Sequence, residues 1–432
     1  MQETKGLIVG VQEKPSSIGK WIVLSLQHVF AMFGATVLVP ILTGLPISVA
    51  LVASGIGTLS YIAVTKAKVP VYLGSSFAYI MAISLASTQS GVGAAYWGLV
   101  LVGLIYLVVA FVIRYAGKAW LDKLLPPVVI GPMIMIIGLG LAPVAIGQAG
   151  LSPNSADGFF AFLATDWRNP VIAIFTFLVT IVINLFFKGF WKVIPFIIGI
   201  LSGYVLSIIL GVVNLGTVFS GSILSLPEFN FIFTYAPNFT ALLMFAPIAF
   251  VTIAEHIGDH TVLGEICEKD FLRDPGLDKT LMGDGIATAL SAMIGGPANT
   301  TYGENTGVVA MTKVGSVYVT GLAAVFAILL GFMTPINDFI ASIPAPVMGG
   351  ISMVLFGLIA VNGLRVLVKH KVDVTQMRNL IIIATMLIFG LGQAEIIINP
   401  AVSLSGMAFA AVVGVVLNQV ISGLEKVFKT TS

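Results

Sequence analysis

Two carboxylates and two histidines alternate at helical spacing within one apolar stretch of the chain. Glu255 and Asp259 are four residues apart, and so are His256 and His260, so each pair shares one face of a helix. Two carboxylates on one face repel each other if both are ionised, and burial disfavours the charged form. We therefore expect at least one of these acids to carry a proton, which is the chemistry that proton-coupled transport requires.

The two histidines allow a second interpretation. The segment from His256 to His260 is similar to the H-x-x-E-H zinc signature, with Asp259 where the signature has Glu. No third ligand is evident, and the single cysteine, Cys267, makes a cysteine-based metal site or a disulfide within the chain unexpected. An intramembrane metal-dependent hydrolase therefore remains a distant alternative.

Two short polar stretches follow Gly/Pro breaks in otherwise apolar segments. Residues 74–76 (Gly-Ser-Ser) follow Pro70, and residues 299–301 (Asn-Thr-Thr) follow Pro297. A short helix that starts near Gly303 would direct unpaired backbone N–H groups and a positive dipole end into the protein. With the Glu304 carboxylate as acceptor, this stretch could present donors and an acceptor to one small polar ligand. The alternative is a structural Glu304 that caps the short helix.

The composition sets the class of protein. Of 432 residues, 58% are hydrophobic and only 9% are charged, and the mean hydropathy is +1.05. An ordinary soluble domain carries roughly 25% charged residues. These values exclude a soluble enzyme, a nucleic-acid binder and a disordered chain, and they indicate a polytopic helical membrane protein. The apolar run from Trp21 to Leu42 lacks a small-residue cleavage signature, so we expect a retained first helix and not a signal peptide.

Apolar runs and their breaks predict fourteen membrane segments, with boundaries defined to within several residues. They are expected at residues 21–42, 48–65, 71–87, 95–114, 126–147, 170–187, 193–213, 239–262, 280–295, 302–312, 316–334, 345–364, 377–393 and 403–424. With this count, every Lys and Arg except Arg168 falls on one side of the membrane. The positive-inside rule then predicts a multi-pass protein of the cell membrane with both termini cytoplasmic.

The two halves of the chain match weakly at similar offsets, which predicts an internal repeat. Each half, 1–213 and 239–432, holds seven segments, and an odd number requires the second copy to be inverted in the membrane. Inverted repeats with paired broken helices are typical of secondary transporters. The repeat aligns Phe77 with Glu304 just after the two breaks, where the Phe77 ring could pack on a flat ligand. The matching residues are 27–28 with 255–256, Pro70 with Pro297, and 126–142 with 344–360.

Four motifs spread along the chain resemble those of the nucleobase-ascorbate transporter family, also called nucleobase:cation symporter-2, and most closely its bacterial uracil permeases. The resemblance covers essentially the whole chain. The stretch from Glu304 to Lys313 is its most specific part, because it fits the family signature of a polar residue, Asn, Gly and then Thr followed by a basic residue. The motifs are Gln27-His28, residues 74–78 (GSSFA), residues 254–258 (AEHIG) and residues 299–305 (NTTYGEN).

The resemblance implies an all-α polytopic membrane protein with fourteen transmembrane segments arranged as seven plus seven inverted. Segments 3 and 10 would each contain a short β-strand, and the two strands would pair antiparallel. A core domain would comprise segments 1–4 and 8–11, at about 21–114 and 239–334. A gate domain would comprise segments 5–7 and 12–14, at about 126–213 and 345–424, and could pair two copies of the chain.

The resemblance also implies proton-coupled uptake of uracil, with the proton as coupling ion, no cofactor and no nucleic-acid partner. Glu255 and Glu304 would accept hydrogen bonds from ring N–H groups, while the backbone N–H groups of Gly303 and Phe77 would meet the carbonyls. The Phe77 ring would flank the base. These roles suit uracil, whose edge alternates N–H donors with C=O acceptors.

The residues expected to support binding or proton coupling are Asp259, His260, Tyr302, His28 and Ser76. One departure concerns the relay, because one characterised type of uracil permease carries a His one turn after the Glu, where this chain has Asp259 followed by His260. The proton could therefore be relayed by Asp259, His260 or Glu255 alone. A purine or xanthine permease of the same family is the closest alternative, and the acid at Glu304 favours a pyrimidine by resemblance.

Overall fold

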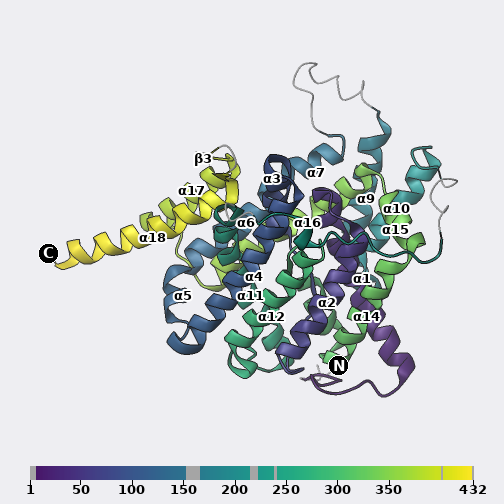
Figure 1. Cartoon of the computed structure of the whole chain (residues 1–432), viewed down its shortest axis with the longest axis horizontal. Coiled ribbons are helices and arrows are strands. Elements are labelled where there is room, and N and C mark those ends of the chain that lie inside the picture. The colour runs from purple at the N-terminus through teal and green to yellow at the C-terminus, as the bar shows by residue number, and fades with distance from the viewer. Residues whose placement is uncertain (1–5, 152–165, 215–221, 238–240, 400–401, 431–432) are drawn as a thin grey trace.

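The computed structural model describes residues 6–151, 166–214, 222–237, 241–399 and 402–430, and within them the chain is mostly helical, as predicted (Figure 1). The first half contains α1 (Ile18–Thr43), α2 (Ile47–Val64), α3 (Ile80–Ser90), α4 (Val92–Ala116), α5 (Ala119–Leu124), α6 (Pro127–Gly140), α7 (Ala142–Gln148), α9 (Arg168–Phe186) and α10 (Pro195–Ile209). The second half contains α11 (Ala241–Cys267), α12 (Leu277–Met293), α13 (Gly303–Thr312), α14 (Val317–Phe332), α15 (Thr334–Ala341), α16 (Ala345–Lys369), α17 (Met377–Leu391) and α18 (Gly406–Thr430).

Length, apolarity and exposed side chains mark these helices as membrane helices. Seven helical stretches of the described residues, one of which comprises α6 and α7 together, are long and apolar enough to cross a bilayer, and α10, α14 and α17 are shorter apolar helices. On α4, Leu104, Val108 and Phe111 follow one another at helical spacing and are all exposed. Such apolar faces are rare on soluble monomers. They suit contact with lipid and support a multi-pass membrane protein.

Each predicted segment overlaps a helix of the structure, but several boundaries differ. Helix α11, which corresponds to the eighth predicted segment, continues to Cys267 and does not end near residue 262. Residues 261–267 contain no proline, and Leu263 and Cys267 pack in a buried apolar cluster, which sustains the extra turn. Asp259 and His260 therefore lie inside a helix and not at its end. The fifth segment is split into α6 and α7 at Leu141.

Two three-residue strands pair antiparallel within the protein, as the family resemblance implied. Strand β1 (Leu73–Ser75) pairs with β2 (Asn299–Thr301), with Gly74 opposite Thr300. The Ser76 N–H donates to the Ala298 carbonyl at 2.9 Å and the Tyr302 N–H donates to the Tyr72 carbonyl at 3.1 Å, which extends the pairing at both ends. Strand β1 leads through a 3₁₀ turn (Phe77–Tyr79) into α3, and β2 leads into α13. The pairing thus sets the starts of two short helices beside each other.

A tyrosine locks this strand pair. The Tyr302 hydroxyl donates to the Ser75 carbonyl at 2.9 Å and accepts from Thr36 at 3.2 Å. Its ring covers Gly74, where an added Cβ would lie 2.4 Å from the ring carbon Cζ. Residue 74 must therefore be glycine because the tyrosine ring approaches the backbone too closely for any side chain.

The helices pack in two groups, with α11 between them. In one group α4 packs against α12, and in the other α6 packs against α16. An added Cβ on Gly103 would meet the Gly285 carbonyl at 2.6 Å, and one on Gly363 would meet the Gly131 carbonyl at 2.4 Å. Small residues at such crossings let membrane helices approach closely. Helix α11 contacts α4 and α12 on one side and α6 and α18 on the other, which places its side chains between the groups.

A β-hairpin that the sequence analysis did not predict connects α17 to α18. Strands β3 (Glu395–Asn399) and β4 (Val402–Ser405) pair antiparallel, so the first residues of the predicted segment 403–424 are strand and not helix. The β-branched run Ile396, Ile397 and Ile398 favours this conformation. Figure 1 shows the hairpin beside α17, and it shows α18 running outward from the body of the protein.

Candidate functional site

A cavity of about 310 Å³, here called the inner cavity, lies where β1 and β2 lead into their helices and face α11 and α16. It brings together most of the residues predicted from the sequence, although they come from three separate parts of the chain. The predicted residues that line it are Ser76, Phe77, Glu255, Asp259, Tyr302, Gly303 and Glu304.

The acids of α11 face this cavity. Glu255 and Asp259 lie one helical turn apart and are half-buried. The Asp259 carboxylate accepts a hydrogen bond from the Thr301 hydroxyl of β2 at 2.7 Å. Within the described part of the chain, no side chain forms a hydrogen bond to Glu255 or Glu304. Their carboxylates are therefore available to a ligand.

The start of α13 supplies hydrogen-bond donors. Its N-cap residue, Tyr302, makes no side-chain hydrogen bond to the first turn, so the N–H groups there have no cap. Gly303 borders open space, because an added Cβ would meet no atom within 4 Å. The buried hydroxyl oxygens of Ser76 and Thr300, which line the cavity, have no hydrogen-bond partner among the described residues. Donors and acceptors thus converge on one small space.

An apolar wall completes the inner cavity. Phe77 is half-buried, and its ring packs edge-on against Phe356 of α16, with the ring centroids 6.1 Å apart and the planes at 75°. Ile137, Leu355 and Ile359 extend this wall. An aromatic face beside aliphatic side chains suits a flat ring, whose edge could then meet the polar groups opposite.

Two predicted residues lie away from the cavity. His28 is only 2% exposed, and the Asn305 amide donates to its Nδ1 atom at 3.0 Å, so it is a buried, hydrogen-bonded histidine that does not line the cavity. His260 is also buried, and its Nε2 atom is hydrogen-bonded to the Tyr61 hydroxyl. It projects from a different face of α11 than the acids and does not line the cavity.

The structure shows a buried hydrogen-bonded pair, His256 and Asp284, that the sequence analysis missed. Asp284 of α12 lies 2.7 Å from His256 Nδ1, and both side chains are essentially inaccessible to solvent. The His256 ring stacks on His260, with the ring centroids 3.8 Å apart. The available signal was an acid in the middle of the predicted segment 280–295. It went unnoticed because its partner, His256, belongs to another predicted segment.

These contacts also bear on the metal interpretation. His256 pairs with Asp284, and His260 pairs with Tyr61. Across the residues that the structure describes, no group of three or more His, Cys, Asp or Glu side chains is placed to hold a metal ion. The two histidines instead form part of the contact between α11 and its neighbours.

The inner cavity extends to exposed basic residues. Lys192 and Arg365 line it, and the Arg365 guanidinium donates to the Asn362 side chain at 3.3 Å. Both cations belong to the groups predicted to lie on the cytoplasmic side. The cavity therefore connects the converging polar groups with the basic end of the protein.

Comparisons with known proteins agree on the kind of protein. A family model described as "Permease family" matches residues 19–398. A uracil permease of Bacillus caldolyticus is 46% identical over 419 residues, which cover 96% of this chain and 95% of that protein. A uracil permease of Bacillus subtilis (strain 168) is 46% identical over 422 residues, or 96% of each chain.

A solved structure supports the fold. The transmembrane domain of a cyanobacterium bicarbonate transporter, BicA, matches with a TM-score of 0.63 at 15% sequence identity. The match covers 94% of this chain and 98% of that one. At this identity the similarity shows the fold alone, which is that of a helical membrane transporter.

The buried pair generates a prediction on stability. We expect Asp284→Ala to destabilise the detergent-solubilised protein by about 3 kcal/mol, because it leaves His256 buried without its partner. Thermal unfolding followed by circular dichroism would measure the change. The matched control is Asp122→Ala, which removes a half-exposed partner of Lys118 and should cost less than about 1 kcal/mol. Equal stability of the two variants would contradict a structural role for the pair.

Proposed function

Because the chain belongs to the nucleobase-ascorbate transporter family of permeases, we propose that it imports uracil across the cell membrane by proton-coupled symport. Membership of a permease family makes it a transporter and not an enzyme, so the hydrolase alternative is wrong. The observation that carries the proposal is the convergence of Glu255, Glu304 and the start of α13 on one cavity walled by Phe77. Two full-length relatives that are uracil permeases support the substrate.

The proposed binding mode follows from the chemistry of the cavity. Uracil alternates N–H donors with C=O acceptors along its edge, and the cavity alternates carboxylates with backbone N–H groups. We propose that Glu255 and Glu304 accept from the ring N–H groups and that the Gly303 and Phe77 N–H groups donate to the carbonyls. The Phe77 ring then covers one face of the base. Each buried polar group gains a partner, which avoids the cost of leaving one unpaired.

Proton coupling rests on the three acids of the inner cavity. Glu255, Asp259 and Glu304 line the same space, and mutual repulsion disfavours full ionisation of all three. We propose that Asp259 exchanges the coupled proton, since its hydrogen bond from Thr301 links it to the strand beneath the substrate. His260 then supports α11 from its other face through Tyr61.

We further propose the architecture that the family resemblance implies: fourteen spans, inverted repeats at 1–213 and 239–432, and core and gate domains. The strand pairing supports the repeat, because equivalent breaks at Pro70 and Pro297 lead to strands related by antiparallel symmetry. The two packing groups support the two domains. With the basic residues on the cytoplasmic side, both termini are cytoplasmic and the inner cavity faces the cytoplasm. Lipids contact the outer helices, and two copies pair through the gate domain.

The decisive test is uptake of labelled uracil into proteoliposomes, with and without an imposed proton gradient. We expect saturable uptake that an inward proton gradient drives above equilibrium. Excess unlabelled uracil should compete strongly, and xanthine should not. Stronger competition by xanthine than by uracil would favour a purine permease. Uptake that does not depend on the proton gradient would contradict proton coupling.

The first binding prediction concerns Glu304. Replacement by Gln substitutes a donor amide for an acceptor oxygen, so we expect uracil affinity to fall by about 100-fold or more, equivalent to roughly 3 kcal/mol. Isothermal titration of the purified protein measures this. The control is Glu265→Gln on the same helix as Glu255, an exposed partner of Lys369 that should not alter binding. Unchanged affinity in a folded Glu304→Gln variant would remove Glu304 from the site.

The second prediction separates binding from coupling. We expect Asp259→Asn to reduce gradient-driven accumulation of uracil much more than it reduces equilibrium affinity, because an amide accepts the Thr301 hydrogen bond but cannot exchange a proton. Uptake at several imposed pH differences, compared with Asp122→Asn, gives the measurement. Accumulation equal to that of the unaltered protein would assign the relay to another group.

A further inference from the structure

A second cavity, of about 390 Å³ and here called the outer cavity, lies on the other side of the wall that bounds the inner cavity. Phe77, Ala78 and Ile137 line both spaces, so a thin partition separates them. The outer cavity extends to Thr88 near the end of α3 and to Gln393 just after α17. The connections that follow these two helices are the ones predicted to face away from the cytoplasm. A solute leaving this cavity through the partition would enter the inner cavity.

The outer cavity has the walls of a site for a flat ring. Met81, Met244 and Met407 line it, together with aliphatic side chains of α3, α6 and α11. Thioether sulfur makes favourable contacts with aromatic rings, and methionine adapts to the shape of a ligand. Among the described residues that line this cavity there is no Lys or Arg, so nothing there favours an anion.

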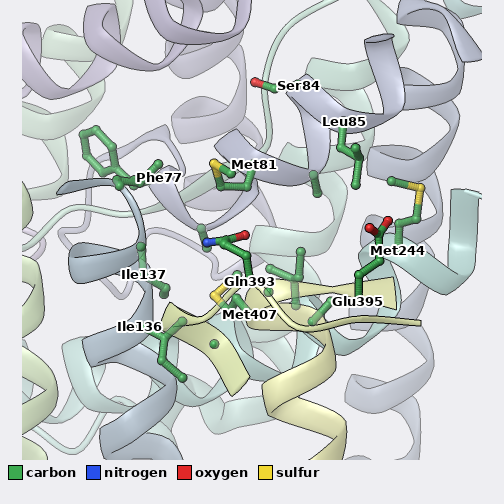
Figure 2. Close-up of a pocket in the computed structure, with 18 of the residues that line it drawn as sticks. Phe77, Met81, Ser84, Leu85, Ile136, Ile137, Met244, Gln393, Glu395 and Met407 are labelled. Atoms are coloured by element: carbon green, nitrogen blue, oxygen red, sulfur yellow. The ribbon is translucent and has the colours of Figure 1, made fainter. Parts of the chain in front are cut away.

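The amide and carboxylate side chains of the outer cavity come from the hairpin side, and α3 adds the hydroxyl residues Ser84 and Thr88. Figure 2 shows Gln393 and Glu395 projecting from the hairpin end of the cavity toward Met81 and Met244. The Gln393 amide offers both a donor and an acceptor, and the Glu395 carboxylate offers acceptors. This is the same complement of polar groups as in the inner cavity: acceptors for ring N–H groups and a donor for a carbonyl.

The backbone around Gln393 holds it in place. Gln393 has a φ of 51°, in the left-handed region that non-glycine residues rarely adopt. The N–H of Gly406 donates to the Ala394 carbonyl at 3.0 Å, and pairing of Glu395 with Ser405 closes the base of the hairpin. An added Cβ on Gly406 would lie 2.9 Å from Gln393 Oε1, so the amide packs against the bare face of that glycine. The hairpin thus presents Gln393 and Glu395 to the cavity as a defined pair.

We propose that the outer cavity is a second binding site for a neutral, flat heterocycle that carries amide-type N–H and C=O groups, which it holds before the ligand reaches the inner cavity. The inference rests on the proposed uracil transport, since it assigns the same class of ligand to a second place on one path. Gln393 and Glu395 hold the polar edge of the ring, and the methionines contact its faces.

The test uses a thiol as a local reporter in purified, detergent-solubilised full-length protein. Cys267→Ser removes the single cysteine, and Ser84→Cys places a thiol of similar size on the wall of the outer cavity. The rate of its modification by a bulky thiol reagent is then measured against uracil concentration. Glu304→Gln is added to disable the inner site, so that protection reports the outer site alone.

We expect uracil to slow modification of the thiol introduced by Ser84→Cys in this background. Gln393→Leu should raise the uracil concentration that gives half-maximal protection about tenfold, because it removes one or two hydrogen bonds to the ligand. Glu395→Gln should raise it independently. The matched control is Gln376→Leu, which makes the same change in an exposed glutamine at the opposite end of α17 and should leave the concentration unchanged.

Absence of protection in the Glu304→Gln background would overturn the outer site, as would protection that neither Gln393→Leu nor Glu395→Gln alters. Equilibrium uracil binding to the otherwise unaltered protein is measured in parallel. If that binding is present and protection is absent, only the outer site fails. If the unaltered protein binds no uracil, the proposed function fails.

Discussion

The arrangement of the site depends on one constraint: backbone N–H and C=O groups inside a membrane must find partners within the protein. The short helices α3 and α13 are each preceded by three residues of extended backbone, and either strand alone would leave its N–H and C=O groups unpaired. They satisfy each other through the β1–β2 pair, which the Ser76–Ala298 and Tyr302–Tyr72 hydrogen bonds extend. Two helix starts are thereby fixed side by side, and their uncapped N–H groups become the donors of the inner cavity.

Helix α11 presents polar residues to two different environments, because its two acids lie on one face of the helix and its two histidines lie on another. Glu255 and Asp259 face the cavity, whereas His256 and His260 face Asp284 and Tyr61 in the protein interior. A hydrogen bond contributes only modest net stability, yet removing one partner of a buried pair is costly because the other partner is left unsatisfied. The histidine face therefore holds α11 in a fixed rotation about its axis. That rotation directs both acids toward the starts of the two short helices.

The sequence was sufficient for features encoded within short motifs and insufficient for those created by distant contacts. Motifs around Phe77, Glu255 and Glu304 predicted residues that do meet at one cavity, and the family resemblance implied the strand pair. Asp284 escaped notice because its partner His256 lies on another helix, 28 residues away. The hairpin after α17 was missed because residues 394–402 were assigned to the connection between two predicted segments, and only closure of the hairpin onto Gly406 orients Gln393.

The residues that form the partition between the two cavities belong to two different groups of helices. Phe77 and Ala78 follow directly from β1, so they are fixed to the strand pair and to Tyr302. Ile137 belongs to α6, which packs against α16 in the other group of helices. A displacement of one group against the other would therefore separate the two sides of the partition without breaking the strand pair. The helix starts that are proposed to bind the substrate would keep their geometry while the path beside them opens, as alternating access around a fixed site requires.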